Sequence, residues 1–315
     1  MNIAEAIQKF ERYVTTERRL SPTTTRYYVG EVQRFATYLS DQKIVDTEEI
    51  ASRDVRSWQM SLIEAGEAPG TVTKQVAALR AWFKYLRRQG IVERDVMAKV
   101  TPPRMPKRLP IFFRESEVEH IYDDIYPDNY TGEVEKMVLR LLYETGMRRS
   151  ELAGLTLGSI DFAALTIKVL GKRNKERYIP IEAELAHALT DYIGQRAALL
   201  ETLRAAPESD HGRAGAATAA GDRLLVNAKG RPLGTQAIYK IVDHYMSQLS
   251  SAERTSPHIF RHTFATHMLN EGASIDALKE LLGHSDLAAT EVYTHVTREH
   301  LKESYKQAHP RAIKK

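Results

Sequence analysis

The sequence contains no cysteine, and it also lacks long apolar stretches. The absence of cysteine excludes disulfide bonds, thiolate nucleophiles and cysteine-ligated zinc. No run of about 18 or more apolar residues occurs that could span a membrane, and charged residues interrupt Met1–Leu20 throughout, unlike a signal peptide. We therefore expect a cytoplasmic protein without a membrane partner.

The overall composition is that of an ordinary globular protein. Its 315 residues are 43% hydrophobic and 27% charged, which is sufficient for two domains with separate cores. The formal net charge is only +4. This charge permits a nucleic-acid partner without requiring one, because binding depends on where the cations lie.

The first 100 residues carry apolar side chains at helical spacing. Short connections between the four runs predict a compact all-α bundle, which we assign to residues 1–100. Ser21-Pro22 is typical of a helix start, with serine as the N-cap and proline in the first helical position. The four helices are expected at residues 2–19, from Pro22 to Leu39, over Val55–Ile63, and from a Thr71 cap to Gly90.

A proline-rich basic segment, residues 101–110, separates this bundle from residues 111–315. Its four prolines exclude a helix or central strand, so we expect an extended linker. The second domain is expected to combine helices with a small hairpin. We expect helices over Arg114–Tyr126, Thr131–Glu144, a short run after Arg148, Glu184–Leu203 and Thr235–Met246; strands over Thr166–Val169, Arg177–Ile181 and Leu224–Val226; and a flexible surface insertion over Ala205–Gly221.

The stretch from residue 258 to 295 organises the second domain: HIFRHTFATHMLNEGASIDALKELLGHSDLAATEVYTH. It predicts a helix that stops near Gly272, a second helix from a Ser274 cap to Gly283, and a short third one. His258 and Arg261 are three residues apart and share a helix face.

Several side chains of this domain suit the breaking of a phosphodiester bond without a metal. Arg148 and Arg261 each stand at a helix start, where planar guanidinium groups and backbone N–H groups favour a phosphate. Tyr293 can attack the phosphorus, although a phenol with a pKa of about 10 needs assistance. His258 can accept its proton, and Lys172 on the hairpin tip can protonate the leaving 5′ oxygen.

The sequence resembles the tyrosine recombinases, and most closely the Xer type of bacterial site-specific recombinase. The resemblance is carried by TGMRRSELAGL, GKRNKERYIP, the stretch from 258 to 295, and the N-terminal LSPTTTRYYVGEVQRFATYL. It covers most of the chain apart from Ala205–Gly221. The combined pattern is specific, whereas a single piece such as HxxRH is not.

The resemblance implies a role for each matching residue. Arg148 and Arg261 match the arginines that clamp the phosphate, and Tyr293 matches the nucleophile that forms a 3′-phosphotyrosyl link. Lys172 matches the hairpin lysine that protonates the leaving group. The remaining matches are His258 as proton acceptor, His284 as a hydrogen-bond donor to the scissile phosphate, and Glu151 as an acidic residue that supports the site.

The resemblance also implies an architecture and partners. The expected fold is mainly α: an all-α core-binding domain and a mostly helical α+β catalytic domain with a small antiparallel sheet, which together form a C-shaped clamp on double-stranded DNA. Four protomers, as a homo-tetramer or together with a second recombinase, would exchange strands through a Holliday junction, with C-terminal tails docked between neighbours. A DNA translocase is a possible activator. No cofactor or metal is expected.

Alternative functions share parts of this pattern. Chromosome dimer resolution is favoured by the Xer-like pattern and the lack of an additional arm-binding domain, while a mobile-element integrase or invertase uses the same scaffold. A type IB topoisomerase has similar chemistry, but the Xer-like bundle and tail argue against it. A catalytically inactive DNA-binding protein would need a lost catalytic residue, and none is lost. His258 and His262 have the spacing of a zinc pair, yet the glutamate of an HExxH helix is missing.

Overall fold

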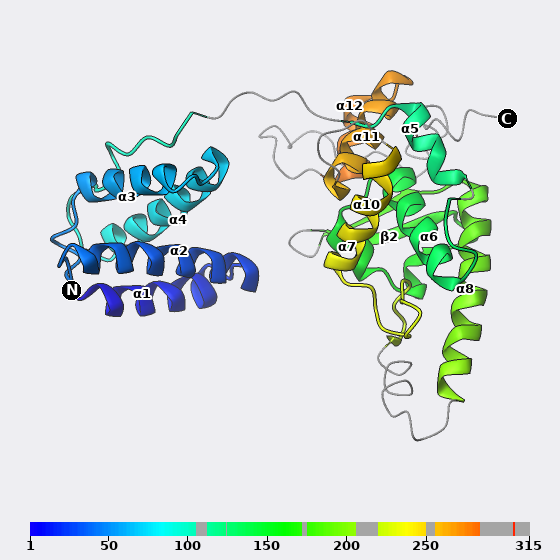
Figure 1. Cartoon of the computed structure of the whole chain (residues 1–315), viewed down its shortest axis with the longest axis horizontal. Helices are drawn as coiled ribbons and strands as arrows, with labels where there is room; N and C mark the ends of the chain where they lie inside the picture. Colours follow the sequence, from blue (N-terminus) through cyan, green and yellow to red (C-terminus); the bar gives the residue numbers. More distant parts are fainter. Residues whose placement is uncertain are drawn as a thin grey trace. The chain divides into compact units, whose positions relative to one another are not determined.

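The computed structural model describes residues 1–104, 112–123, 125–171, 175–205, 220–249, 256–283 and 305. The chain divides into two compact units, Met1–Arg108 and Leu109–Lys315, each with its own apolar core (Figure 1). The described residues are mainly helical, with a three-stranded antiparallel sheet in the second unit. This confirms the predicted fold class of helical bundle plus mostly helical α+β domain.

Unit 1 is a bundle of four α-helices with a short π-helical extension of the first. The Ser21 hydroxyl accepts a hydrogen bond from the Thr24 N–H at 3.2 Å, so the predicted cap is confirmed. The last helix begins at Pro69 rather than at Thr71, because proline fits the first helical turn, where no N–H partner is needed. The elements are α1 (Ile3–Arg12), the π-helix Tyr13–Glu17, α2 (Pro22–Asp41), α3 (Ser52–Glu64) and α4 (Pro69–Arg88).

Unit 2 is built around α6 (Tyr130–Thr145), which is buried along most of its length. Helices α8 (Ala183–Arg204), α10 (Thr235–Leu249) and α11 (Pro257–Asn270) pack against α6 (Figure 1). The predicted helix over Arg114–Tyr126 is wrong in its second half: it tightens into a 3₁₀ turn and ends before Asp123, whose backbone is extended. The helices are α5 (Glu115–Glu119), the 3₁₀ turn His120–Tyr122, α6, α7 (Arg149–Gly154), the 3₁₀ turn Leu157–Ser159, α8 (Ala183–Arg204), α10 (Thr235–Leu249), α11 (Pro257–Asn270) and α12 (Ile275–Leu282).

The sheet has the order β1-β2-β3, with β1 at Ile160–Asp161. The predicted hairpin is confirmed as β2 (Thr166–Leu170) and β3 (Glu176–Pro180), with Leu170 opposite Glu176. Ile167 and Ile179 are paired and fully buried, which fixes the inward face of the hairpin. Strand β2 ends at Leu170 and β3 begins at Glu176, with Gly171 and Lys175 as the described residues between them.

A strand predicted over Leu224–Val226 is absent: this described segment makes only the isolated bridges Thr156–Arg223 and Val226–Pro232. Its apolar residues are buried, and hydrogen bonds to Leu155 and Leu233 replace a regular ladder. The predicted insertion over Ala205–Gly221 lies outside the described residues except at its ends. Ala220 at one end is fully buried beside Val226.

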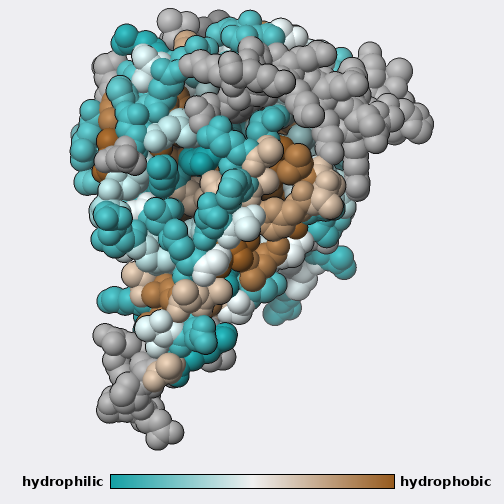
Figure 2. All heavy atoms as spheres, turned by 90° about the vertical axis from the view of Figure 1, so that its right-hand side faces the viewer, coloured by the Kyte–Doolittle hydropathy of each residue, from teal (hydrophilic) through white to brown (hydrophobic). Residues whose placement is uncertain are grey.

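The surface of the molecule is mixed in character. In the space-filling view, hydrophilic residues cover much of the face toward the viewer and hydrophobic residues gather in a band across it (Figure 2). Within the described ranges, no helix combines the length and the apolar character that crossing a bilayer requires.

Candidate active site

The first candidate arginine, Arg148, lies directly after a sharp change of chain direction. Helix α6 ends at Gly146, which adopts a left-handed conformation with φ +59°. Two residues later, Arg148 is extended and forms the N-cap position of α7. Its N–H donates to Glu151 Oε2 at 2.8 Å, so a side chain from the first turn caps the start of the helix.

Glu151 is the buried centre of a charge cluster. Arg148 Nη1 donates to Oε1 of its carboxylate at 2.8 Å, and Arg177 from β3 adds a bidentate pair at 2.9 and 2.8 Å. Burial alone would raise the pKa of Glu151. The hydrogen bonds and charge of Arg177, together with the Arg148 donors, outweigh burial and lower the pKa of Glu151 to about 2. The carboxylate is therefore ionised at neutral pH.

The second candidate arginine, Arg261, lies in α11 and is only 9% exposed. Its Nη1 donates to the Gly146 carbonyl at 2.8 Å, and its Nη2 donates to the Leu282 carbonyl. Burial, followed by the positive charges of Arg148 and Arg177, lowers the pKa of Arg261 to about 10. That value is far above neutrality, so Arg261 remains charged.

Three consecutive carbonyl groups at the end of α12 each accept a hydrogen bond from a different arginine. Arg177 Nε donates to Leu281 O at 2.7 Å, Arg261 Nη2 donates to Leu282 O, and Arg148 Nη2 donates to Gly283 O at 3.2 Å. The last carbonyls of a helix carry partial negative charge, which cations stabilise. The cluster thus fixes the point where the chain leaves α12 for residue 284.

Glycine is required at the end of α12 for two reasons. Gly283 has φ +62°, as the predicted left-handed stop requires, and a Cβ at this position would lie 3.2 Å from Arg177 Cδ. At the other end, the Ser274 hydroxyl accepts from the Ala277 N–H at 3.1 Å, which confirms the predicted cap. Both ends of α12 are therefore fixed by local sequence.

His258 lies on the first turn of α11, one turn before Arg261, and is exposed. Desolvation and the positive charges of Arg149, Arg261 and Arg148 lower the pKa of His258 below its usual value. Its imidazole is therefore neutral at pH 7, which is the form that accepts a proton. The neighbouring Pro257 and Ser256 set the start of this helix.

Of the seven predicted site residues, the structure describes Arg148, Glu151, His258 and Arg261. It brings Arg148 and Arg261 together at the end of α12, and places His258 within reach of their charges. The other three, Lys172, His284 and Tyr293, lie outside the described residues. The described neighbours of Lys172 are Gly171 and Lys175, joined by a hydrogen bond of 2.8 Å from Gly171 N to Lys175 O.

Sequence reasoning missed Arg177. We predicted it only as the first residue of the return strand, whereas it contacts both Glu151 and the end of α12. The available signal was a cation placed at the start of a strand that otherwise turns apolar toward Ile179. Its partners are 26 and 104 positions away, so spacing alone did not reveal them.

His262, the possible partner of His258 in a zinc pair, is exposed on α11. Across the described ranges, no three histidine, aspartate or glutamate side chains gather in a way that could hold a metal ion. The charged groups that do gather are three arginines around one carboxylate. Such a cluster suits a phosphate rather than a metal ion.

The sequence matches known families over both units. Residues 112–300 match the phage integrase family, and residues 7–90 match its N-terminal SAM-like domain. The chain therefore belongs to the phage integrase family and is a tyrosine recombinase.

Among curated proteins, the chain is similar to the Xer recombinases. It is 35% identical to tyrosine recombinase XerC of Listeria welshimeri over 97% of both chains. It is also 35% identical to tyrosine recombinase XerC of Bacillus subtilis, over 100% of this chain and 99% of that one.

Solved structures with the same fold include two complexes with DNA. XerH bound to its difH substrate has a TM-score of 0.65 at 21% identity, over 95% of this chain and 83% of that one. A lambda integrase dimer bound to a core site has a TM-score of 0.65 at 15% identity, over 91% and 75% of the two chains. At these identities the likeness shows the shared fold.

Proposed function

We propose that this protein is a site-specific DNA recombinase that resolves chromosome dimers by cutting and rejoining DNA through a 3′-phosphotyrosyl intermediate. The observation that carries the proposal is the convergence of Arg148 and Arg261 on adjacent carbonyls at the end of α12. The chain continues from there into the segment that carries His284 and Tyr293. The two cations therefore contact the end of the helix that leads directly into the segment carrying the proposed nucleophile.

In the proposed reaction, the scissile phosphate binds between Arg148 and Arg261. The Arg148 side chain is 30% exposed and can turn from the Gly283 carbonyl toward a phosphate oxygen. Guanidinium groups bond two oxygens at once and stabilise the charge that develops on them. His284 would add a third donor to the nonbridging oxygens.

The Tyr293 oxygen then attacks the phosphorus, and the bond between phosphorus and the 5′ oxygen breaks. Neutral His258 accepts the phenol proton, and Lys172 supplies a proton to the 5′ oxygen, which leaves as a hydroxyl. Rejoining reverses these steps when a 5′ hydroxyl attacks the phosphotyrosine. One phosphate ester replaces another, so the bond energy is conserved and no nucleotide cofactor is needed.

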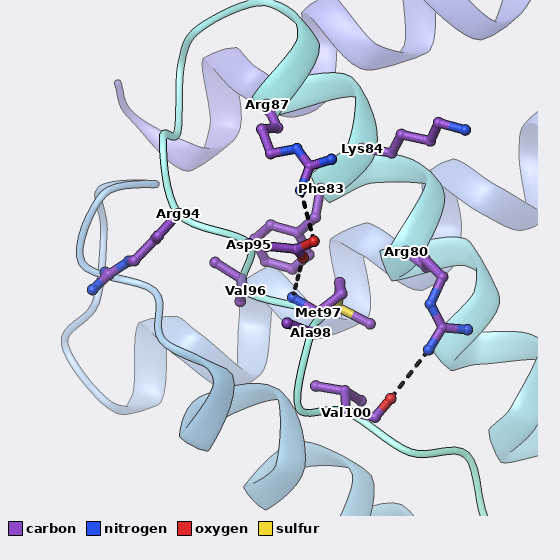
Figure 3. Close-up of a pocket in the computed structure, with 10 residues that line it drawn as sticks. All are labelled: Arg80, Phe83, Lys84, Arg87, Arg94, Asp95, Val96, Met97, Ala98 and Val100. Carbon is purple, nitrogen blue, oxygen red and sulfur yellow. Dashed lines mark hydrogen bonds and ion pairs between the residues drawn. The ribbon is translucent and has the colours of Figure 1, made fainter.

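Unit 1 offers a basic cleft that suits the DNA backbone. Its volume is about 480 Å³, between α4 and the segment that follows it, and its rim carries Arg80, Lys84, Arg87 and Arg94 (Figure 3). Arg87 is paired with Asp95 at 2.6 Å, and Arg80 donates to the Val100 carbonyl at 3.1 Å. Lys84 makes no hydrogen bond or ion pair within the described part of the chain, and its ammonium group points away from Asp95 in Figure 3.

We therefore propose that residues 1–100 form a core-binding domain, that residues 101–110 link it to a catalytic domain over 111–315, and that both domains contact one DNA duplex. Exposed cations that neutralise phosphates make affinity fall steeply with salt. Lys84→Gln should weaken DNA binding and reduce the salt dependence by about one released ion.

The proposed biological role follows from the Xer relatives. XerC proteins of two genera align with almost the whole chain at 35% identity. We propose that the enzyme acts in the bacterial cytoplasm as a tetramer on two chromosomal sites, with a second recombinase as partner and a DNA translocase as activator. Co-purification of the chain with a second recombinase on its DNA site would support the mixed tetramer.

The experiment that tests the function maps covalent adducts on host DNA. Sheared chromosomal fragments are incubated with the protein, adducts are trapped by denaturation, and the attached DNA is sequenced. We expect one recurrent cleavage position on the chromosome, and none with Tyr293→Phe, which still binds DNA. Adducts spread without sequence preference would favour a topoisomerase, and adducts at the borders of a mobile element would favour an integrase.

A further inference from the structure

We propose that Arg177 is a positioning residue of the recombination reaction. It neutralises Glu151, so that the positive charge of Arg148 is not cancelled by this carboxylate and the Arg148 side chain stays free to bind phosphate. This inference rests on the proposed function, because it concerns how the phosphate clamp is kept available. Arg177 is not among the seven residues predicted from the sequence. It lies on β3, at the base of the hairpin whose turn carries Lys172.

Two arginines share the Glu151 carboxylate. Oε1 accepts from Arg148 Nη1 at 2.8 Å and from Arg177 Nη1 at 2.9 Å. Oε2 accepts from the Arg148 backbone N–H at 2.8 Å and from Arg177 Nη2 at 2.8 Å. Only Arg177 meets both oxygens with its guanidinium group, which is the strong bidentate arrangement. Arg148 holds the carboxylate with a single side-chain nitrogen.

The two guanidinium groups differ in their exposure to solvent. The Arg177 side chain is 10% exposed, and its three nitrogens all donate to protein atoms, with Nε directed at Leu281 O. The Arg148 side chain is 30% exposed, and its second nitrogen meets the Gly283 carbonyl at the longer distance of 3.2 Å. Arg177 is therefore committed to the protein, whereas Arg148 can exchange a carbonyl for a phosphate oxygen.

Arg177 also sets the net charge of the cluster. A buried carboxylate beside a single arginine forms a neutral pair, and that pair attracts an incoming phosphate poorly. With Arg177 present, the cluster of Arg148, Arg177, Arg261 and Glu151 has three positive charges and one negative. Without Arg177, the cluster would have two positive charges and one negative, and Arg148 would be the described arginine still hydrogen-bonded to Glu151. The clamp would lose both net charge and the mobility of its exposed arginine.

Arg177 also joins three separate elements: β3, α7 through Glu151, and α12 through Leu281. Its stem packs closely on Gly283, where an added Cβ would lie 3.2 Å from Arg177 Cδ. Removing the side chain therefore affects local packing as well as charge. The test must separate these two effects.

A charge-rescue comparison makes that separation. Wild type, Arg177→Met, Glu151→Gln and the double variant are compared on a nicked duplex of the chromosomal site mapped with wild-type protein. The nick traps the cleaved state, so adduct formation is read as a first-order rate. DNA affinity and thermal unfolding are measured for each protein in parallel.

We expect Arg177→Met to slow adduct formation by at least about tenfold, while DNA affinity changes less because most phosphate contacts remain. Adding Glu151→Gln to Arg177→Met should raise the rate several-fold, because it removes the unbalanced negative charge. The same substitution in wild type should not raise it. Arg177→Lys, which keeps the charge but loses the bidentate geometry, should fall between wild type and Arg177→Met.

Two results would overturn the inference. Adduct formation by Arg177→Met at the wild-type rate would show that Arg177 has no part in positioning. A double variant no faster than Arg177→Met would show that packing, and not the charge of Glu151, explains the loss.

Two controls complete the design. If Arg177→Met does not fold, Arg177→Gln with and without Glu151→Gln gives the same comparison, because glutamine keeps one donor to the carboxylate. A wild-type protein that forms no adduct would refute the proposed function and this inference together. Normal wild-type adduct with no charge rescue would refute the inference alone.

Discussion

Arg261 Nη1 donates a hydrogen bond of 2.8 Å to the carbonyl oxygen of Gly146, a residue 115 positions earlier in the chain. This contact joins α11 to the end of α6, directly before Arg148. The position of one of the two arginines proposed to bind the phosphate thus depends on the turn that presents the other. Gly146 makes this turn with φ +59°, and a Cβ there would lie 2.5 Å from Phe264 Cδ1.

The first prediction concerns this turn. Gly146→Ala places a methyl group against the buried ring of Phe264 and strains a left-handed backbone, so we expect a loss of about 2 kcal/mol or more in the free energy of unfolding. Adduct formation should fall with it, because Arg148 and Arg261 both move. Gly30→Ala is the matched control: Gly30 lies in α2 with no atom within 4 Å of an added Cβ, and alanine should stabilise slightly.

The two tryptophans make this measurement specific to one unit. Trp58 and Trp82 both lie in unit 1, so tryptophan fluorescence follows its unfolding, while circular dichroism follows the helices of both units. The circular-dichroism transition that does not coincide with the fluorescence transition belongs to unit 2. Gly146→Ala should lower the midpoint of that transition and leave the midpoint of the fluorescence transition unchanged. A shift in fluorescence alone would contradict this assignment.

The second prediction concerns the pH dependence of stability. The pKa of Glu151 is about 2 in the folded protein, against 4.5 for an unperturbed glutamate, so the folded state favours the ionised carboxylate. This stabilisation is complete above the unfolded pKa and is lost as the pH falls toward 2. The difference corresponds to roughly 3 kcal/mol at neutral pH.

Denaturant unfolding of wild type and Glu151→Gln at several pH values measures this effect. We expect the wild-type advantage to be largest at pH 7 and to shrink steadily between about pH 5 and pH 2. The tryptophan transition of unit 1 should not respond to the substitution. An advantage that stays constant over this range would show that the ionisation of Glu151 does not contribute to stability.

The third prediction concerns His258. Its pKa is lowered by desolvation and by neighbouring arginines, so the neutral, proton-accepting form dominates at pH 7. The cleavage rate should rise with pH below that pKa and be level around pH 7. His258→Gln should lower the rate by about a hundredfold or more and remove this dependence.

His262→Gln is the matched control, since His262 is exposed on the same helix. It should keep the wild-type rate around pH 7 and shift the pH profile only slightly, because the effect of His262 is the smallest among the charges that lower the pKa of His258. Single-turnover cleavage between pH 5 and 8 measures all three proteins. A His258→Gln variant with the wild-type profile would exclude this histidine as the proton acceptor.

Helix starts and stops were predictable because each depends on a few adjacent residues. Ser274 and Gly283 bound α12 as expected, since an N-cap hydroxyl and a left-handed glycine act locally. The helix predicted through Tyr126 was wrong, because the apolar spacing of that segment says nothing of the extended backbone at Asp123. Local signals therefore predicted which elements exist more reliably than they predicted where each element ends.

The candidate site was predictable only in part. Arg148 and Arg261 could be proposed because helix starts and a family motif mark them, and the fold brings their side chains together at the end of α12. Arg177 was not found, because its importance depends on contacts with Glu151 and Leu281, which only the folded chain brings together. Sequence spacing identifies groups on one element, whereas an ion pair between a strand and a helix requires the tertiary structure.

Tyr293 is the proposed nucleophile, and a second tyrosine, Tyr305, follows it in the chain and allows a comparison. Tyr305 is fully buried, its hydroxyl donates to the Glu144 carbonyl at 2.6 Å, and burial raises its pKa well above the usual value. Such a phenol is a poor nucleophile. The reaction should therefore use Tyr293 and leave Tyr305 unmodified.

The most direct measurement is the identity of the residue that carries DNA after cleavage. The trapped adduct is digested with nuclease and trypsin, and the modified peptide is sequenced by mass spectrometry. We predict that Tyr293 carries a 3′-linked nucleotide and that no other tyrosine does. A nucleotide on Tyr305 or on any residue other than Tyr293 would contradict the account.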